Sequence, residues 1–103
     1  MLAEFAIVPL DHGTSMKEYV AQILDLVDKS GLDYELTAMG TLVEGEAPMV
    51  WHLLRDCHEA VGAMSSRVET RIVIDDKKGA AGRLSGKVKD VEDVLGRRLK
   101  TAV

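Results

Sequence analysis

A chain of 103 residues has room for one domain with one hydrophobic core, and we expect residues 1–103 to form a single domain. The 47% hydrophobic and 29% charged residues are ordinary for a globular protein and exclude a disordered chain. The net charge is −4 and the basic residues are scattered among acids, which argues against a nucleic-acid-binding protein.

The cysteine content and the hydrophobic pattern predict a cytoplasmic protein. Cys57 is the only cysteine, so no intrachain disulfide can form and a reducing compartment fits best. No stretch approaches 18 apolar residues, and the first residues lack a basic segment followed by an apolar run. We therefore expect neither export nor association with a membrane.

The first third of the chain predicts a strand followed by a helix. Hydrophobic and polar residues alternate over 2–10, as in a strand. Ser15 followed by Glu18 forms a capping box, so we expect a helix to begin at Ser15 and to end before Gly31. Apolar residues then recur at steps of three and four, which gives this helix one apolar face: Met16, Tyr19, Val20, Ile23, Leu24 and Val27.

The middle of the chain predicts a β-hairpin. Two strand-like segments, 34–37 and 41–44, flank Met39 and Gly40. Gly40 permits the positive φ that a tight reversal requires, so we place the turn there.

The remainder predicts a helix, a strand and a last helix. Pro48 is expected in the first turn of the second helix, and strict alternation over 67–75 predicts a strand. The apolar stripe of the second helix is expected to contain Val50, Leu53, Leu54, Cys57, Val61 and Met64. A polar loop at 77–82 precedes the last helix, whose apolar positions are Leu84, Val88, Val91, Leu95 and Leu99.

This order predicts an α+β fold, the ferredoxin-like β-α-β-β-α-β sandwich with an additional C-terminal helix. Two helices are expected to cover one face of a four-stranded antiparallel sheet. The uncovered face is expected to present four small apolar residues among its charges: Ala6, Val8, Val43 and Val73. Because a partly apolar open face is usually covered by a partner, we predict self-association through it.

The sequence carries no convincing metal or catalytic site. His52, Cys57 and His58 lie within seven residues, but the two histidines are about 120° apart around a helix and so point to different faces. Cys57 belongs to the apolar stripe and is interpreted as a core residue. No nucleophile elbow or phosphate loop occurs. We expect no enzyme, no cofactor and no metal; a small cofactor-free enzyme is a further alternative.

Two groups of polar residues are candidates for ligand binding. We expect the first turns of both main helices, around Thr14-Ser15 and 47–48, to lie at one end of the sheet with Tyr34. The hairpin turn, at the opposite end, contributes Thr37, Met39 and Thr41. A ligand that touches both groups would then need two subunits. Ordinary strand, core and turn roles would also explain each of these residues.

Several segments together resemble the thiamine-binding protein family, which is similar to the YkoF-like binders of thiamine and hydroxymethylpyrimidine. The most specific is the Y-E-x-x-x-M-G-T-x-x-E block within 34–46. Shorter matches lie at 8–10, 57–61 and in the strand over 67–76. The resemblance covers nearly the whole chain and implies a ferredoxin-like fold, homotetramers assembled through sheet faces, and binding of thiamine or its hydroxymethylpyrimidine moiety without catalysis.

The resemblance also implies that Tyr34, Thr37, Met39 and Thr41 of this block bind the ligand. Thr14, Ser15 and Glu44 are further candidates. An aminopyrimidine needs an acceptor for its amine, a donor for a ring nitrogen and a flat apolar wall. Glu44, the threonine hydroxyls and the Met39 and Tyr34 side chains are the predicted sources. The alternative function is a regulatory or scaffolding oligomer that binds another small ligand or an anion at helix N-termini.

Overall fold

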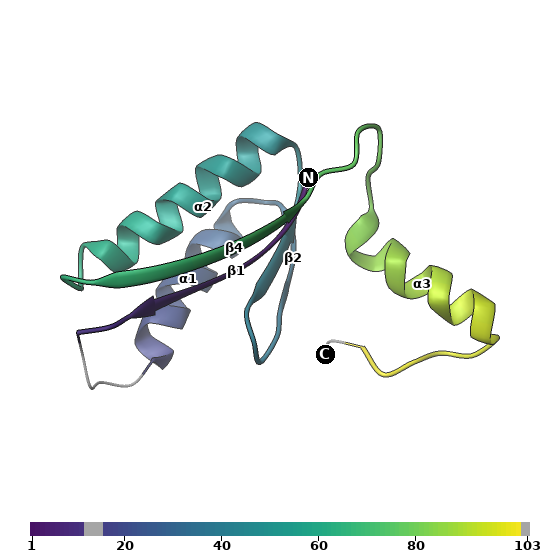
Figure 1. Cartoon of the computed structure of the whole chain (residues 1–103), viewed down its shortest axis with the longest axis horizontal. Coiled ribbons are helices and arrows are strands. Elements are labelled where there is room, and N and C mark those ends of the chain that lie inside the picture. Colours follow the sequence, from purple (N-terminus) through teal and green to yellow (C-terminus); the bar gives the residue numbers. More distant parts are fainter. Residues whose placement is uncertain (12–15, 102–103) are drawn as a thin grey trace.

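The computed structural model describes residues 1–11 and 16–101, and these form the predicted ferredoxin-like sandwich with an additional C-terminal helix (Figure 1). The sheet is antiparallel with strand order β2-β3-β1-β4. The elements in chain order are β1 (Leu2–Pro9), α1 (Lys17–Lys29), β2 (Asp33–Leu36), β3 (Thr41–Glu44), α2 (Ala47–Gly62), β4 (Val68–Asp75) and α3 (Arg83–Leu95). None of these helices is long and apolar enough to cross a membrane.

The hydrophobic core lies between α1, α2 and one face of the sheet. Strand β1 turns Ala3, Phe5 and Ile7 toward the helices, since alternate residues of a strand share a face. Each fully buried aliphatic or aromatic side chain contributes roughly 1.5–3 kcal/mol to folding. Five of the six residues predicted for the apolar stripe of α2 are buried: Val50, Leu53, Leu54, Cys57 and Val61. The sixth, Met64, is partly buried but lies beyond the helix, which ends at Gly62.

The prediction for the open sheet face was wrong at one position. Val43 pairs directly with Ala3 and is fully buried, because residues opposite each other in an antiparallel pair share a face. Val73 does lie on the open face and is 65% exposed. Ala6 and Val8 are half-buried there. Three of the four predicted apolar residues therefore belong to the open face.

Two glycines of the first half have different roles. Gly31 follows α1 with a φ of +75°, as predicted for a helix end. Gly40 does not adopt a positive φ, so the predicted reason for this glycine was wrong. A Cβ at Gly40 would lie 2.9 Å from the carbonyl oxygen of Phe5. Gly40 is therefore needed for the close approach of the hairpin to β1.

Helix α3 differs from the other two helices because no residue of it is buried. It stands apart from the rest of the chain in Figure 1 and contacts the sheet through β3. It ends at Leu95, where Gly96 has a φ of +71°, so the predicted fifth apolar position, Leu99, lies beyond the helix.

Candidate ligand-binding site

A cavity of about 220 Å³ lies between the hairpin, β1 and α1, and we call it the hairpin cleft. Its walls are 5–8 of β1, 36–41 of the hairpin, and the α1 side with Met16, Val20 and Leu24. These side chains are apolar except for two threonines, so the cleft suits a flat, mostly apolar group.

The cleft exists because β1 is longer than its neighbour β3. Pairing between the two strands stops at Phe5 with Thr41, whereas pairing of β1 with β4 continues to Pro9. The β3 side of β1 from Ala6 to Val8 thus has no strand partner among residues 1–11 and 16–101. A free strand edge offers backbone N–H donors and C=O acceptors. The sequence did not predict this free edge, because hydrophobic periodicity does not define the lengths of strands closely.

The hairpin turn is held together by Thr37. Its hydroxyl donates to the carbonyl of Gly40 at 2.9 Å and accepts from the backbone N–H groups of Met39 and Gly40 at 3.2 Å each. Met39 stands at the tip and is 87% exposed, whereas Thr41 is buried at the base of the cleft. The structure therefore brings Thr37, Met39 and Thr41 together around one cleft.

Tyr34 and Glu44 lie at the other end of the hairpin strands. The Tyr34 hydroxyl donates to Asp28 Oδ1 at 2.9 Å, and this bond raises the pKa of Tyr34 because it favours the protonated phenol. Glu44 is buried and accepts the backbone N–H groups of Arg83 at 2.8 Å and Leu84 at 3.1 Å. Both carboxylate oxygens of Glu44 thus cap the first turn of α3, away from the hairpin cleft.

The predicted placement of the helix N-termini was wrong. Met16, next to the start of α1, lines the hairpin cleft, whereas Pro48 and Met49 of α2 line a separate cavity with Lys29 and Ser30 at the end of α1. Each helix follows a strand, and β1 and β3 run antiparallel, so the two helices begin at opposite ends of the sheet. The hairpin turn and the start of α1 therefore meet within one subunit. Thr14 and Ser15 fall outside the described residues.

The histidines and the cysteine have separate surroundings. His58 Nδ1 lies 2.6 Å from Thr70 Oγ1, and His52 Nε2 lies 3.1 Å from an Asp56 carboxylate oxygen. Cys57 is buried, and its burial, with a smaller contribution from Asp56, raises the pKa of the thiol to about 11. Within 1–11 and 16–101, no three His, Cys, Asp or Glu side chains form a set that could hold a metal ion.

Asp11 anchors the end of β1. Its carboxylate accepts hydrogen bonds from the hydroxyls of Ser65 and Ser66 and from the Ser66 backbone N–H at 2.7 Å. These bonds, that of the Ser65 hydroxyl first, hold the pKa of Asp11 well below its usual range. These bonds tie the end of β1 to the α2–β4 connection.

Comparison with known proteins assigns the family. The sequence pattern of the family described as thiamine-binding protein matches residues 3–92. The chain belongs to the thiamine-binding protein family. A UPF0045 protein of Methanothermobacter thermautotrophicus is 37% identical over 96 residues, which cover 90% of this chain and 97% of that protein.

Solved structures of similar proteins share the fold of this family member. A protein of Methanocaldococcus jannaschii superposes with a TM-score of 0.81 at 29% identity, over 89% of this chain and 95% of that one. A Thermotoga maritima protein, whose name links it to thiamine biosynthesis or salvage, has a TM-score of 0.77 at 20% identity, over 87% and 96% of the chains. The family assignment confirms the resemblance carried by the 34–46 block and supports a small-molecule-binding role.

Proposed function

We propose that this protein binds thiamine, or its hydroxymethylpyrimidine moiety, in the hairpin cleft and catalyses no reaction. One observation carries the proposal: a member of the thiamine-binding protein family has a free edge of β1, from Ala6 to Val8, beside an apolar cavity. The proposed contacts are therefore those of the hairpin and β1, with Tyr34 and Glu44 outside the pocket.

The chemistry of an aminopyrimidine suits a strand edge. Its exocyclic amine is a donor and the adjacent ring nitrogen is an acceptor, both in the plane of the ring. Backbone C=O and N–H groups along a strand edge offer the complementary pair. The Val20 and Leu24 side chains provide the flat wall, and the Thr41 hydroxyl adds a polar group at the base.

The size of the cleft favours one ring. Its volume of about 220 Å³ is below the roughly 300–1,000 Å³ of pockets that hold drug-sized ligands. The pyrimidine ring would fill it, and the thiazolium half of thiamine would extend past Met39 at the tip of the hairpin. This arrangement gives the hydroxymethylpyrimidine moiety most of the contacts.

The lining of the cleft supports binding without catalysis. Among the described residues that line it, none carries an acidic or basic side chain. General acid–base catalysis requires such a group within hydrogen-bonding reach of the reacting atoms. The hydroxyl of Thr37 is already committed to the hairpin turn, which makes it a poor nucleophile.

We also propose that copies of the chain associate through the open sheet face, as a homotetramer in the cytoplasm. The exposed Val73 and the half-buried Ala6 and Val8 support an apolar centre for this contact. The single cysteine, buried as a free thiol, suits a reducing compartment.

Calorimetric titration with thiamine and with hydroxymethylpyrimidine tests the binding proposal. Ala38→Trp places a large ring at the cleft, and Ala21→Trp places the same ring on the exposed side of α1 as a control. We expect saturable heat for the wild type and for Ala21→Trp, and at least tenfold weaker binding for Ala38→Trp. If neither ligand gives heat at millimolar concentration, the proposal is wrong. Equal binding by both variants would move the ligand away from the cleft.

A further inference from the structure

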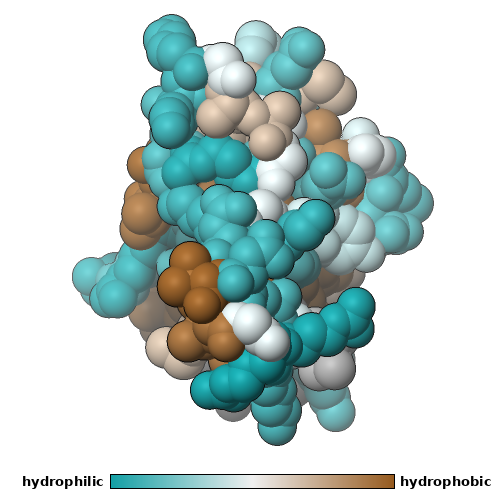
Figure 2. All heavy atoms as spheres, turned by 90° about the vertical axis from the view of Figure 1, so that its right-hand side faces the viewer, coloured by the Kyte–Doolittle hydropathy of each residue, from teal (hydrophilic) through white to brown (hydrophobic). Residues whose placement is uncertain are grey.

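Helix α3 is amphipathic, and its own sheet covers only part of its apolar side: Leu84 and Val88 are half-buried, whereas Val91 and Leu95 are exposed. Leu84, Val88, Val91 and Leu95 recur at steps of three and four and so share one face. The side of α3 that faces β2 across a cavity carries Leu84 and Val88 beside the polar residues Ser85, Lys89 and Glu92. Among the large apolar residues of α3, those exposed are Val91, Val94 and Leu95. Figure 2, which looks at the side of the molecule on which α3 lies, shows an apolar patch surrounded by hydrophilic residues.

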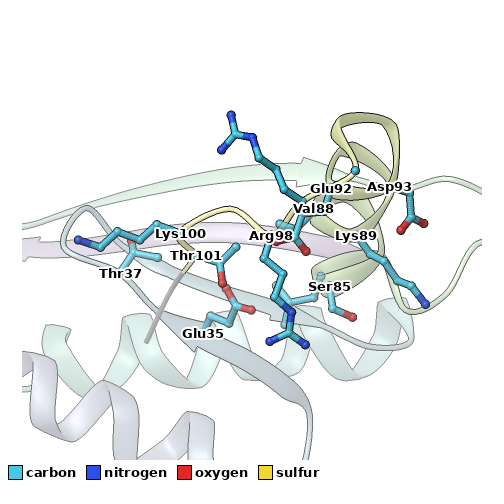
Figure 3. Close-up of a pocket in the computed structure, with 13 residues that line it drawn as sticks. Glu35, Thr37, Ser85, Val88, Lys89, Glu92, Asp93, Arg98, Lys100 and Thr101 are labelled. Atoms are coloured by element: carbon cyan, nitrogen blue, oxygen red, sulfur yellow. The ribbon is translucent and has the colours of Figure 1, made fainter.

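The polar contacts that place α3 lie in its first two turns. Glu44 caps its N-terminus, and Asp75 Oδ2 accepts from Arg83 Nη2 at 2.6 Å and from Lys87 Nζ at 2.8 Å. A cavity of about 830 Å³, which Leu84 and Ser85 already line, separates the helix and the segment that follows it from β2 (Figure 3). The chain thus holds α3 at its first two turns and leaves the apolar side chains of its last two turns, Val91 and Leu95, exposed to another molecule.

The charges of α3 and of the open sheet face are complementary. Residues 83–101 contain six basic and three acidic residues. The strand register places six acidic residues and one basic residue on the open face, namely Glu4, Asp33, Glu35, Glu44, Glu69 and Asp75 with Arg71. Glu44 and Asp75 already bind the chain's own α3, and Glu69 pairs with Arg71, so the acids left for a second copy are Glu4, Asp33 and Glu35. Within the described part of the chain, no ion pair engages Glu4 or Glu35, nor the basic cluster Arg97, Arg98 and Lys100.

We propose that α3 and the segment to Thr101 dock on the open sheet face of a second copy of this chain, while the α3 of that copy docks in return. The apolar face of α3 would cover Val73, Ala6 and Val8 of the second copy, and the basic cluster would meet its Glu4 and Glu35. An exchange of this kind is self-complementary and closes a two-fold dimer. The inference rests on the self-association proposed above and specifies the surfaces that carry it.

A small anion is a weaker explanation of the basic cluster. The cavity that Arg97, Arg98 and Lys100 line also contains the carboxylates of Glu35, Glu92 and Asp93, which would repel an anion (Figure 3). A bound anion would also leave the exposure of Val91 and Leu95 unexplained. A second copy accounts for both the apolar face and the mixed charges.

Complementary charge reversals test the exchange. One variant reverses the sheet face, Glu4→Lys with Glu35→Lys, and the other reverses the tail, Arg97→Glu with Arg98→Glu and Lys100→Glu. We expect native mass spectrometry and light scattering at low salt to show that each variant alone loses half or more of the wild-type mass. An equimolar mixture should regain it, since each mixed pair then joins opposite charges at both contacts. Reversal of two exposed helix residues, Glu18→Lys with Glu59→Lys, is the matched control and should keep the wild-type mass.

Each other outcome has a definite meaning. If the reversed variants keep the wild-type mass, or if their mixture stays dissociated, the exchange of α3 is wrong, although association through other parts of the sheet face could hold. A wild type that is monomeric at all concentrations would overturn both the exchange and the proposed self-association. Thiamine titration of the same samples judges the hairpin cleft separately, because none of the reversed residues lines it.

Discussion

The hairpin cleft and α3 are both built around the short strands β2 and β3, but they differ in what completes them. The cleft is formed by residues of one subunit: Gly40 approaches β1 closely, and α1 provides the wall opposite the hairpin. Helix α3 is held by polar contacts to Glu44 and Asp75 at one end and buries none of its residues. The cleft is thus complete within one subunit, whereas the packing of α3 is complete only in the assembly that we propose.

The largest expected difference between the two regions is in the cost of removing an apolar side chain. Phe5 is buried and lines the cleft, so Phe5→Ala should lower the free energy of unfolding by about 3–5 kcal/mol. Val94 of α3 is 88% exposed, so Val94→Ala should change it by less than about 0.5 kcal/mol. Urea unfolding followed by circular dichroism, at a protein concentration where the chain is monomeric, measures both. Similar losses would show that α3 is already packed in the single chain.

Two glycine substitutions test the same difference between the hairpin cleft and α3. An added methyl at Gly40 would meet the carbonyl oxygen of Phe5, so Gly40→Ala should cost about 1–3 kcal/mol and weaken ligand binding. Gly86 lies inside α3 with nothing within 4 Å of its Cβ position, so Gly86→Ala should stabilise the helix by roughly 1 kcal/mol. Thermal unfolding of both variants measures the change in stability, and thiamine titration measures the change in affinity. A tolerated Gly40→Ala would mean that the hairpin does not depend on its approach to β1.

The cap of α3 should have a smaller and local effect. Glu44→Ala removes the acceptor for two backbone N–H groups and should cost about 0.5–2 kcal/mol of helix stability. Amide hydrogen exchange should show faster exchange across α3 and unchanged protection in β1 and the hairpin. Loss of protection throughout the sheet would instead give Glu44 a role in the core fold.

Hydrophobic periodicity predicted every helix and strand, because the apolar residues of each element recur at the spacing of its secondary structure. It did not predict what depends on pairing between distant segments. The burial of Val43 follows from its register with Ala3, and the free edge of β1 follows from the unequal reach of two strands. Glu44 looked like a ligand-binding carboxylate in the sequence, since nothing near it indicates that α3 returns to use it as a cap. The placement of Thr37, Met39 and Thr41 around the hairpin turn was predicted correctly, because a hairpin brings neighbours in sequence together.

The stabilities of the two regions should both depend on pH, through Asp11 in the sandwich and Asp75 at α3. Hydrogen bonds from Ser65 and Ser66 lower the pKa of Asp11, and those from Arg83 and Lys87 lower the pKa of Asp75. A carboxyl group whose pKa is lower in the folded state stabilises that state above its unfolded value of about 4, and this contribution is lost as the pH falls below it.

Acid should therefore loosen both anchors, with different consequences. Between pH 5 and pH 2 we expect the wild type to lose stability in urea, and Asp11→Asn to begin lower at neutral pH and to lose less. Asp75→Asn should change the acid dependence of exchange in α3 alone, because that anchor holds a helix that buries none of its residues. An equal loss of stability with falling pH in Asp11→Asn and the wild type would contradict the role given to Asp11. A global change in the Asp75→Asn curve would show that α3 and the sandwich unfold as one unit.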